Sequence, residues 1–284
     1  MKQLIVTADD FGLAPAVNEA VEEAHRRGVL SAASLMVTGS AATDAIARAR
    51  RLPNLGVGLH LVLVDGRPAL PPHEIPDLVG PDGRFHSNVA KAGINIFFRP
   101  RARAQVEREI RTQLELFRQT GLALDHVNSH HHFHVHPTVA AILVGVAREY
   151  GVKAVRVPRE RPIESWRVAG DRLVQRLLAW ATQGCWANSL RRRLDAAGIR
   201  SNDCVLGLSD TGDMSVARVA RYVAHLPMGV SELYVHAATE RWAGADSWPA
   251  NYVCRGEFEA LVDAGVIATL QRAGVRPIPF SALA

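Results

Sequence analysis

Residues 4–12 read LIVTADDFG, an unbroken apolar run that ends in two adjacent aspartates. A compact apolar run without polar alternation is typical of a strand buried on both faces, as in a parallel sheet. Pro15 stands where a first helical turn would begin, and residues 16–27 have helical composition before Gly28. This stretch therefore predicts one β/α unit.

The same alternation of short apolar runs and helical stretches continues along the chain. Further strands are expected at 33–37, 57–64, 122–128, 154–157, 204–208, 232–237 and 275–279. Helices are expected at 41–51, 101–120, 138–150, 216–226 and 258–272. About seven β/α units without a break in composition predict a single domain, 1–284, of the α/β class. Right-handed crossovers would close or nearly close its parallel strands into a (β/α) barrel.

Two segments interrupt this rhythm. Residues 65–100 are rich in proline and glycine and predict a long loop, which is more often functional than a mere connector. Residues 160–200 carry tryptophans and leucines among eight arginines, and their spacing predicts amphipathic helices inserted into the repeating scheme.

Composition excludes several classes of protein. With 48% hydrophobic and 21% charged residues, the 284-residue chain is an ordinary globular one. Its net charge of +5 comes without a dense basic stripe, which argues against a nucleic-acid partner. Three cysteines without a CxxC pair argue against a disulfide framework or a thiolate zinc site. No run approaches the ~18 apolar residues of a membrane span, and the N-terminus lacks signal-peptide features, so we expect a cytoplasmic protein.

Histidines are concentrated in one short stretch. Six of the 12 fall between His126 and His136, where even scattering would place about 0.5. A histidine-rich tract of this kind suggests metal binding.

Polar residues that suit catalysis stand at the ends of several expected strands. In parallel α/β folds the active site forms at the carboxyl ends of the strands. The residues found there are Asp9, Asp10, His60, His130 with its neighbours, Arg156 and His236. We expect them to converge on one rim of the barrel.

In the alternative interpretation, Asp9 and Asp10 are ordinary turn residues, since aspartate is common where strands end. In the functional interpretation one aspartate binds a metal ion and the other acts as a general base. Neighbouring strand residues point to opposite faces, so both can face one site only if the chain is already leaving the strand. The freedom of Gly12 makes that plausible.

A lone histidine such as His60, in GVGLHLVLV, is more often a core residue than a ligand. The other polar strand ends favour the ligand role, because one carboxylate and two imidazoles leave coordination positions open for water. Such an open site is what metal-assisted catalysis needs.

The run HVNSHHHFHVHP cannot place every histidine on one ion. If the run is extended, His130, His132 and His134 share one face and His131 the other. The alternative is a solvent-facing histidine cluster. A buried Arg156 would need a carboxylate partner such as Asp9, and a core or capping role remains open for His236.

Five motifs in order resemble one family: TADDFG, GLHL, SHHHFH, the RxP of VRVP and ELYVHA. They are similar to the YdjC-like (ChbG-type) carbohydrate deacetylases, relatives of the NodB-type polysaccharide deacetylases with a distorted (β/α) barrel. The resemblance spans residues 3 to about 240. The stretches VNSHHHFHVHP, PALPPHEIPDL and RLPNLGVGLHLVL look more like the subgroup associated with hopanoid biosynthesis.

The resemblance implies a role for each matching position. Asp9 would be the general base, Arg156 would orient it, and His236 would be the general acid. One divalent ion, Mg or Zn, would be held by Asp10, His60 and His130. We assign His132 and His134 to substrate contact. Two positions depart from the family pattern: Asn128 stands where many relatives have Asp, and Ala237 replaces a common proline.

The implied reaction is removal of an N-acetyl group from an N-acetylglucosaminyl substrate, and the subgroup implies a glycosylated hopanoid lipid. The arginines and tryptophans of 160–200 could lie peripherally on the inner membrane, or these helices could merely cover the barrel. Soluble chitooligosaccharides are an alternative substrate, and a non-catalytic sugar- or metal-binding protein is an alternative class. The chain could also form a homodimer.

Overall fold

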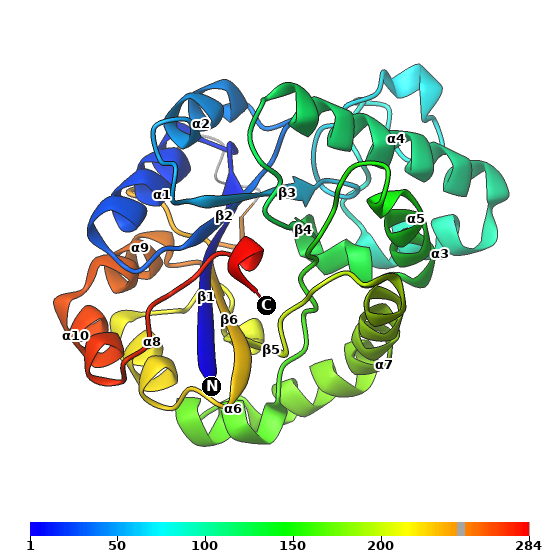
Figure 1. The fold of residues 1–284 in the computed structure, drawn as a ribbon. Helices are drawn as coiled ribbons and strands as arrows, with labels where there is room; N and C mark the ends of the chain where they lie inside the picture. Colours follow the sequence, from blue (N-terminus) through cyan, green and yellow to red (C-terminus); the bar gives the residue numbers. More distant parts are fainter. Residues whose placement is uncertain (243–247, 284) are drawn as a thin grey trace.

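A computed structural model describes residues 1–242 and 248–283 and contains one parallel sheet. Its strand order is β4-β3-β2-β1-β6-β5 (Figure 1). The strands are β1 (Lys2–Phe11), β2 (Ala32–Leu35), β3 (Gly56–Leu61), β4 (Val127–Ser129), β5 (Cys204–Leu206) and β6 (Gly229–Val235). Every strand pairs with its neighbours in parallel, as the buried apolar runs predict.

Helices lie around the outside of the sheet (Figure 1). They are α1 (Pro15–Arg27), α2 (Ala42–Ala49), α3 (Val89–Phe98), α4 (Pro100–Gln119), α5 (Pro137–Ala147), α6 (Pro162–Ala169), α7 (Leu173–Ala197), α8 (Val216–Ala224), α9 (Cys254–Val262) and α10 (Ala264–Arg272). A proline opens four of them, because its fixed φ suits the first helical turn and its missing N–H would be unpaired there in any case.

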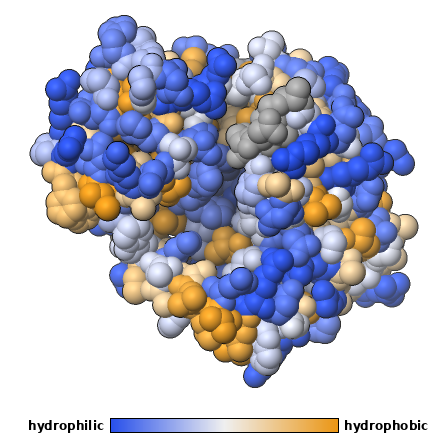
Figure 2. All heavy atoms as spheres, turned by 180° about the vertical axis from the view of Figure 1, so that it is seen from behind, coloured by the Kyte–Doolittle hydropathy of each residue, from blue (hydrophilic) through white to orange (hydrophobic). Residues whose placement is uncertain are grey.

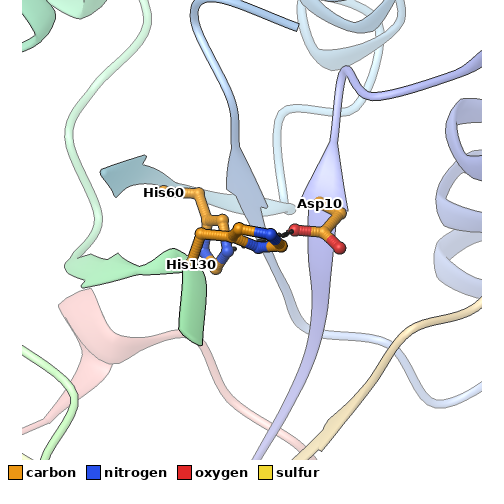
Figure 3. Close-up of side chains that lie close together, drawn as sticks. All are labelled: Asp10, His60 and His130. Atoms are coloured by element: carbon orange, nitrogen blue, oxygen red, sulfur yellow. Dashed lines mark ion pairs between the residues drawn. The ribbon is translucent and has the colours of Figure 1, made fainter. Parts of the chain in front are cut away.

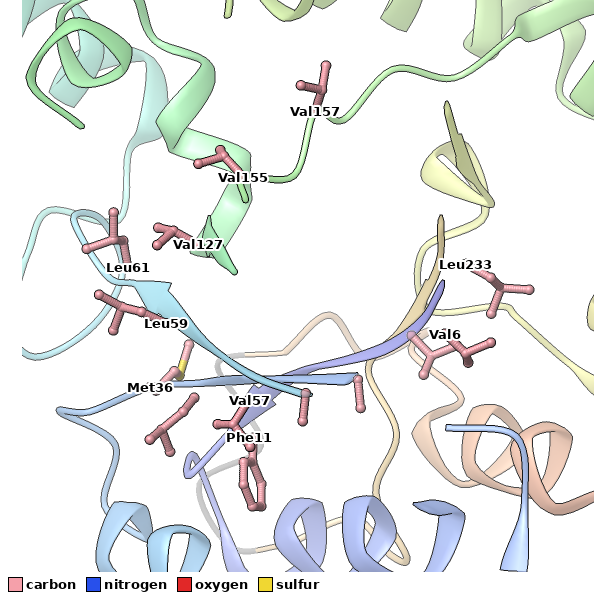
Figure 4. Close-up of a cluster of buried hydrophobic side chains, with 14 of the residues drawn as sticks. Val6, Phe11, Met36, Val57, Leu59, Leu61, Val127, Val155, Val157 and Leu233 are labelled. Atoms are coloured by element: carbon pink, nitrogen blue, oxygen red, sulfur yellow. The ribbon is translucent and has the colours of Figure 1, made fainter. Parts of the chain in front are cut away.

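Apolar side chains on the outer face of the strands pack against these helices. Figure 4 shows part of this core, with Val6 and Phe11 of β1 pointing toward neighbouring helices. Inside the sheet a second apolar cluster joins Ile5 and Ala154 to Phe280 near the C-terminus. Ile5 precedes Asp9 and Asp10 along β1, so this apolar cluster lies nearer the amino ends of the strands than the two aspartates do.

The sheet has six strands, where about seven were expected. The segment expected as a strand at 154–157 forms only isolated bridges, from Val127 to Val155 and from Ala154 to Arg200. Residues 154–159 still link the two edges of the sheet, since Arg156 N–H donates to Val127 O at 3.1 Å and Val205 N–H donates to Arg159 O at 2.8 Å.

A side chain replaces a strand partner in this segment. The N–H of Val157 donates to Asn202 Oδ1 at 2.8 Å, and Asn202 Nδ2 donates back to Val157 O at 2.9 Å. Asn202 is fully buried. Because a side-chain amide satisfies both backbone groups, no regular strand partner is needed there.

Replacing Asn202 by alanine should therefore destabilise the fold by about 2–5 kcal/mol, because a buried N–H and a buried C=O both lose their partner. Urea unfolding of N202A beside the wild type measures this free energy. The exposed Asn54→Ala is the matched control, expected within about 0.5 kcal/mol of wild type. Equal stability of N202A and N54A would contradict the proposed role of Asn202.

Three other predictions of secondary structure differ from the structure. Residues 65–100 are not all loop, because Val89–Phe98 forms α3, with the Asn88 side chain accepting from Lys91 N–H. The single helix expected at 258–272 is two helices, and Asp263 caps the second by accepting from Val266 N–H. The expected strand at 275–279 is absent from the described sheet. The helices expected within 160–200 are present as α6 and α7, but the amphipathic pattern expected of them is wrong for α7, because several of its large apolar side chains, such as Leu178 and Trp180, are exposed while Arg176 is buried.

In the part of the chain that the structure describes, none of the helices combines the length and the apolar character needed to cross a bilayer.

Candidate active site

A cavity of about 590 Å³ opens at the carboxyl ends of the strands. Figure 2 shows a hollow in the surface, with hydrophilic side chains around much of its rim. The cavity lining includes Asp9, Asp10, His60, His130 and His236. The expected convergence of polar strand ends on one rim is therefore present.

Asp10, His60 and His130 lie together, with one potential ligand atom of each within 4.8 Å of the others (Figure 3). They come from the end of β1, from β3 and from the turn that follows β4. Asp10 Oδ1 is 3.2 Å from His60 Nε2 and 3.2 Å from His130 Nδ1. These three side chains are therefore placed where they could hold one metal ion.

A backbone irregularity lets neighbouring aspartates share the cavity. The pairing of β1 with β2 shifts register between Ala8 and Phe11, and Asp10 has a φ of 62°. Aspartate tolerates this left-handed conformation better than most residues. The chain therefore leaves regular strand geometry at Asp10 itself, two residues before Gly12.

The donor atoms of this group fit a divalent cation. Both carboxylate oxygens of Asp10 and Nε2 of His60 are buried and make no hydrogen bond. Buried polar atoms without partners are costly, and a cation would satisfy all three at once. Carboxylate and imidazole donors suit several divalent metals, including zinc and manganese.

Asn128 orients His60 for this role. Its Oδ1 lies 2.6 Å from His60 Nδ1, so Nδ1 donates and Nε2 is left to face Asp10. Its Nδ2 donates to Asp9 Oδ1 at 3.0 Å and to Ser34 Oγ at 2.8 Å. The amide at this position thus ties a potential ligand to the candidate base, without the negative charge of an aspartate.

Arg156 holds Asp9 in place. Its Nη1 is 2.5 Å from Asp9 Oδ2 and its Nη2 is 3.0 Å from Asp9 Oδ1, and both side chains are buried. The expected contact between these residues is present. Burial by itself would raise the pKa of Asp9, but the charge and hydrogen bonds of Arg156, together with the nearby His60 and His236, outweigh it and hold that pKa well below its usual range.

Glu232 completes the cluster and was not foreseen from the sequence. Arg156 donates to Glu232 Oε1 from Nε at 2.9 Å and from Nη2 at 2.6 Å, and Thr7 Oγ1 donates to the same oxygen at 2.8 Å. The signal was available, since Glu232 and His236 fall on one face of a strand by period-2 alternation.

His236 lies against an aromatic wall of the cavity. Its ring centroid is 5.5 Å from that of Tyr252 and 5.6 Å from those of Tyr234 and Trp248. Its backbone N–H donates to Glu257 Oε2 at 2.5 Å, which fixes the strand end where Ala237 replaces the common proline. Burial lowers the pKa of His236, while the carboxylates of Asp10 and Asp9 oppose this shift.

The histidine run is not extended, so the expected alternation of faces does not hold. Residues 130–135 form tight turns in which His131 and His132 have φ of 54° and 53°. His132 lines the cavity, with Nε2 3.4 Å from Tyr234 OH. His131 also lines it and is 3.4 Å from Asp65 Oδ2.

His134, assigned to substrate contact from the sequence, lies beneath the site instead. It is fully buried, with Nδ1 2.7 Å from Ser129 Oγ and Nε2 2.9 Å from Arg156 O. Burial lowers its pKa to about 3, so the ring is neutral. The position of His134 corrects the substrate assignment, and the residue holds the turn and the Arg156 backbone together.

Comparison with known proteins agrees with this geometry. A family model described as YdjC-like protein matches residues 3–272. The chain is 34% identical over 255 residues to a carbohydrate deacetylase of Mus musculus, covering 82% of this chain and 77% of that protein. It is 42% identical over 156 residues to a carbohydrate deacetylase of Brevibacillus brevis, covering 55% of this chain but only 59% of the relative.

A crystal structure shares the fold. It is that of an Enterococcus faecalis V583 protein described as a candidate cellobiose-phosphate cleavage protein. The two superpose with a TM-score of 0.77 over 100% of this chain and 99% of the other, at 24% sequence identity. At that identity the likeness establishes the architecture alone.

Proposed function

This chain belongs to the YdjC-like protein family, and from that premise we propose that it is a metal-dependent carbohydrate N-deacetylase. Its substrate would carry an N-acetylglucosaminyl group, with acetate and the free amine as products. One observation carries the proposal: the group of Asp10, His60 and His130 shares a cavity with His236 and with Asp9, which the buried Arg156 holds from behind.

Asp9 would accept the proton of the attacking water. Arg156 and Asn128 donate hydrogen bonds to its carboxylate, so the base is held in one orientation toward the cavity. When bound, a divalent cation such as magnesium or zinc would supply Lewis-acid polarisation of the acetamide carbonyl.

His236 would donate a proton to the departing amine. Its ring faces the cavity from the end of β6, on a different strand from Asp9. Base and acid would therefore reach the cavity from separate elements, so that different groups can serve water addition and amine departure.

A protein that merely binds sugar or metal is the alternative class. Metal binding needs Asp10 and the two imidazoles, and sugar binding needs the aromatic wall. In this chain the buried Arg156 holds the Asp9 carboxylate, and Glu232 in turn holds Arg156. Neither sugar binding nor metal binding needs such an arrangement. The arrangement favours catalysis over binding alone.

For the finer substrate class we propose a lipid-linked sugar, a glycosylated hopanoid, with soluble chitooligosaccharides as the second candidate. Large apolar side chains are exposed on α3, α6 and α7, and α7 also contributes Ala179 and Gln183 to the cavity lining. The exposed residues are Ile94, Phe97, Phe98, Ile163, Trp166, Val174, Leu177, Leu178, Trp180 and Trp186. Figure 2 shows hydrophobic side chains gathered in patches on the surface. Such a surface suits peripheral contact with a bilayer.

Acetate release from a panel of N-acetylglucosaminyl compounds, soluble and lipid-linked, with and without a chelator, tests the proposal. We expect release that the chelator abolishes and a divalent ion restores. Trp166→Ala/Trp180→Ala should slow release from the lipid-linked compound in vesicles and leave soluble substrates unaffected. The matched control is Met228→Ala, an exposed apolar residue outside α3, α6 and α7.

The outcomes separate the parts of the proposal. No acetate from any compound, with metal supplied, would refute the deacetylase. Release that survives the chelator would refute metal dependence. Equal turnover of the lipid-linked compound by the tryptophan variant and the wild type would refute membrane contact.

A further inference from the structure

One histidine of the histidine-rich stretch lies outside the cavity lining. His126 is fully buried, and Phe280 near the C-terminus stacks on its ring with the two ring centroids 4.5 Å apart. The Nδ1 atom of His126 lies 2.9 Å from Asp125 Oδ2, and its Nε2 atom lies 3.0 Å from Ser34 Oγ. Because all three side chains are buried, we call Asp125, His126 and Ser34 the buried trio.

A glycine in β3 lets the buried trio reach across the sheet. β3 lies between β2, which carries Ser34, and β4, which His126 directly precedes. Gly58 is the register partner of Ser34, and a Cβ atom at Gly58 would lie 2.5 Å from atoms of the His126 ring. Real Cβ atoms almost never come so close to another atom, so any side chain at position 58 would displace the ring. The glycine therefore allows side chains two strands apart to meet.

The buried trio ends at the Asn128 amide. Asn128 Nδ2 donates to Ser34 Oγ at 2.8 Å and to Asp9 Oδ1 at 3.0 Å. An ionised carboxylate only accepts hydrogen bonds, so Asp9 requires the amide nitrogen on its side. The amide oxygen therefore faces His60, whose Nδ1 lies 2.6 Å away and carries the ring proton.

The hydrogen-bond network assigns a direction to each bond of the buried trio. Ser34 Oγ accepts from Asn128, so its single proton is donated to its other contact, His126 Nε2. Nε2 therefore carries no proton, and the ring proton is on Nδ1, where Asp125 accepts it. The Asp125 carboxylate also accepts from the backbone N–H of Ser281 at 2.8 Å, which fixes it from the other side.

We propose that the buried trio positions Asn128, and through its amide both the candidate ligand His60 and the candidate base Asp9. With the ring proton of His126 on Nδ1, a lone pair of Ser34 faces Asn128, and the amide is held at its nitrogen and at its oxygen. A loosened amide would free His60 Nδ1 and one oxygen of Asp9 together. Because it concerns how a ligand and a base are held, this inference rests on the proposed function.

Ser34→Ala removes the hydroxyl between His126 and Asn128. We expect it to weaken zinc binding about tenfold, the lower end of the range for residues that orient a ligand. The kcat for acetate release should fall with KM unchanged, because no substrate contact is lost. Ser31→Ala is the matched control and should behave as wild type: Ser31 is also buried, but its hydroxyl bonds to backbone groups outside the site, including Ile278 O at 2.8 Å. Calorimetric zinc titration and steady-state kinetics measure these quantities.

Two substitutions of His126 separate positioning from packing. Asparagine places its amide near the position of Nδ1 and can donate to Asp125, but it offers Ser34 no acceptor. Glutamine places its amide near the position of Nε2 and can accept from Ser34, but it loses the bond to Asp125. A purely structural role favours His126→Asn, which keeps the bond to a charged group. We expect instead that His126→Gln binds zinc more tightly and turns over faster than His126→Asn, whichever variant is more stable to urea.

NMR of the metal-free protein tests the proton positions without any measurement of activity. Long-range proton–nitrogen spectra should show the His126 ring proton on Nδ1, with the signal identified by its loss in His126→Gln. A proton on Nε2, or wild-type zinc affinity and turnover in Ser34→Ala, would overturn the inference. So would tighter zinc binding by His126→Asn than by His126→Gln.

The outcomes also separate this inference from the proposed function. If Ser34→Ala does not fold, the ring proton and the two His126 variants decide the matter. If the wild type releases no acetate while Ser34→Ala binds zinc more weakly, the deacetylase falls and the positioning role stands. If the wild type releases acetate and all variants bind zinc and turn over equally, the positioning role falls and the deacetylase stands.

Discussion

Asp9→Asn is expected to lower kcat by about 10²–10⁴-fold, the usual contribution of a positioned general base. The amide keeps the size of the carboxylate and can still accept a hydrogen bond from Arg156, but it cannot take a proton from water. Affinity for a divalent ion should be nearly unchanged, because Asp9 lies outside the group of Asp10, His60 and His130. Steady-state acetate release and calorimetric metal titration measure the two quantities separately.

Loss of activity through unfolding must be distinguished from loss of the base. Removing one charge of a buried pair can cost about 3–5 kcal/mol, but Arg156 keeps its bonds to Glu232 in this variant. Urea unfolding of D9N gives the residual stability. Asp195→Asn, an exposed carboxylate on α7, is the control and should behave as wild type. A folded D9N enzyme that turns over at the wild-type rate would overturn the assignment of Asp9 as base.

The sequence was most informative where local chemistry and topology agree. The apolar run before Asp9 predicted a buried strand, and parallel topology brings the ends of β1, β3 and β4 to one rim. His60 and His130 could therefore be placed near Asp10 without coordinates. The helices of 160–200 were also predicted, although α7 does not keep its large apolar side chains on its packed face.

Predictions from the local sequence pattern were wrong where the backbone conformation, or a partner distant in sequence, determines the structure. The prolines of 65–100 masked α3, since a capping asparagine at position 88 outweighs the loop composition around it. Extended geometry for the histidine run assumed ordinary φ, whereas His131 and His132 are left-handed. That conformation sends His134 beneath the site, which no periodicity could reveal.

Partners remote in sequence were also hidden. Asn202 substitutes for a strand at Val157, 45 residues away, so counting apolar runs overestimates the number of strands. Glu232 and Arg156 are 76 residues apart, and only the fold makes them a pair. The wider relation to NodB-type deacetylases and the hopanoid subgroup stay predictions.

The second large effect is expected in the affinity for divalent metal ions, which a titration measures. Asp10→Asn is expected to weaken binding of zinc or manganese by more than about 100-fold. Removing a residue that only orients a ligand typically lowers metal affinity about 10–100-fold, and removing a ligand itself should lower it further. Asn128→Ala should fall within that smaller range, since it frees His60 Nδ1 but leaves all three candidate ligands in place. The exposed His225→Gln is the control and should bind as wild type.

Thermal unfolding gives an independent measure of the same site. A cation that binds only the folded chain should stabilise it by about 2.7 kcal/mol at 100-fold excess over Kd. The gain is expected here because the cation would satisfy Asp10 oxygens and His60 Nε2 that are otherwise buried without partners. Asp10→Asn should lose this gain, Asn128→Ala should need more metal to reach it, and His225→Gln should keep it. Equal metal affinity and equal stabilisation in D10N and wild type would place the ion elsewhere, because no substitution of a true ligand leaves both unchanged.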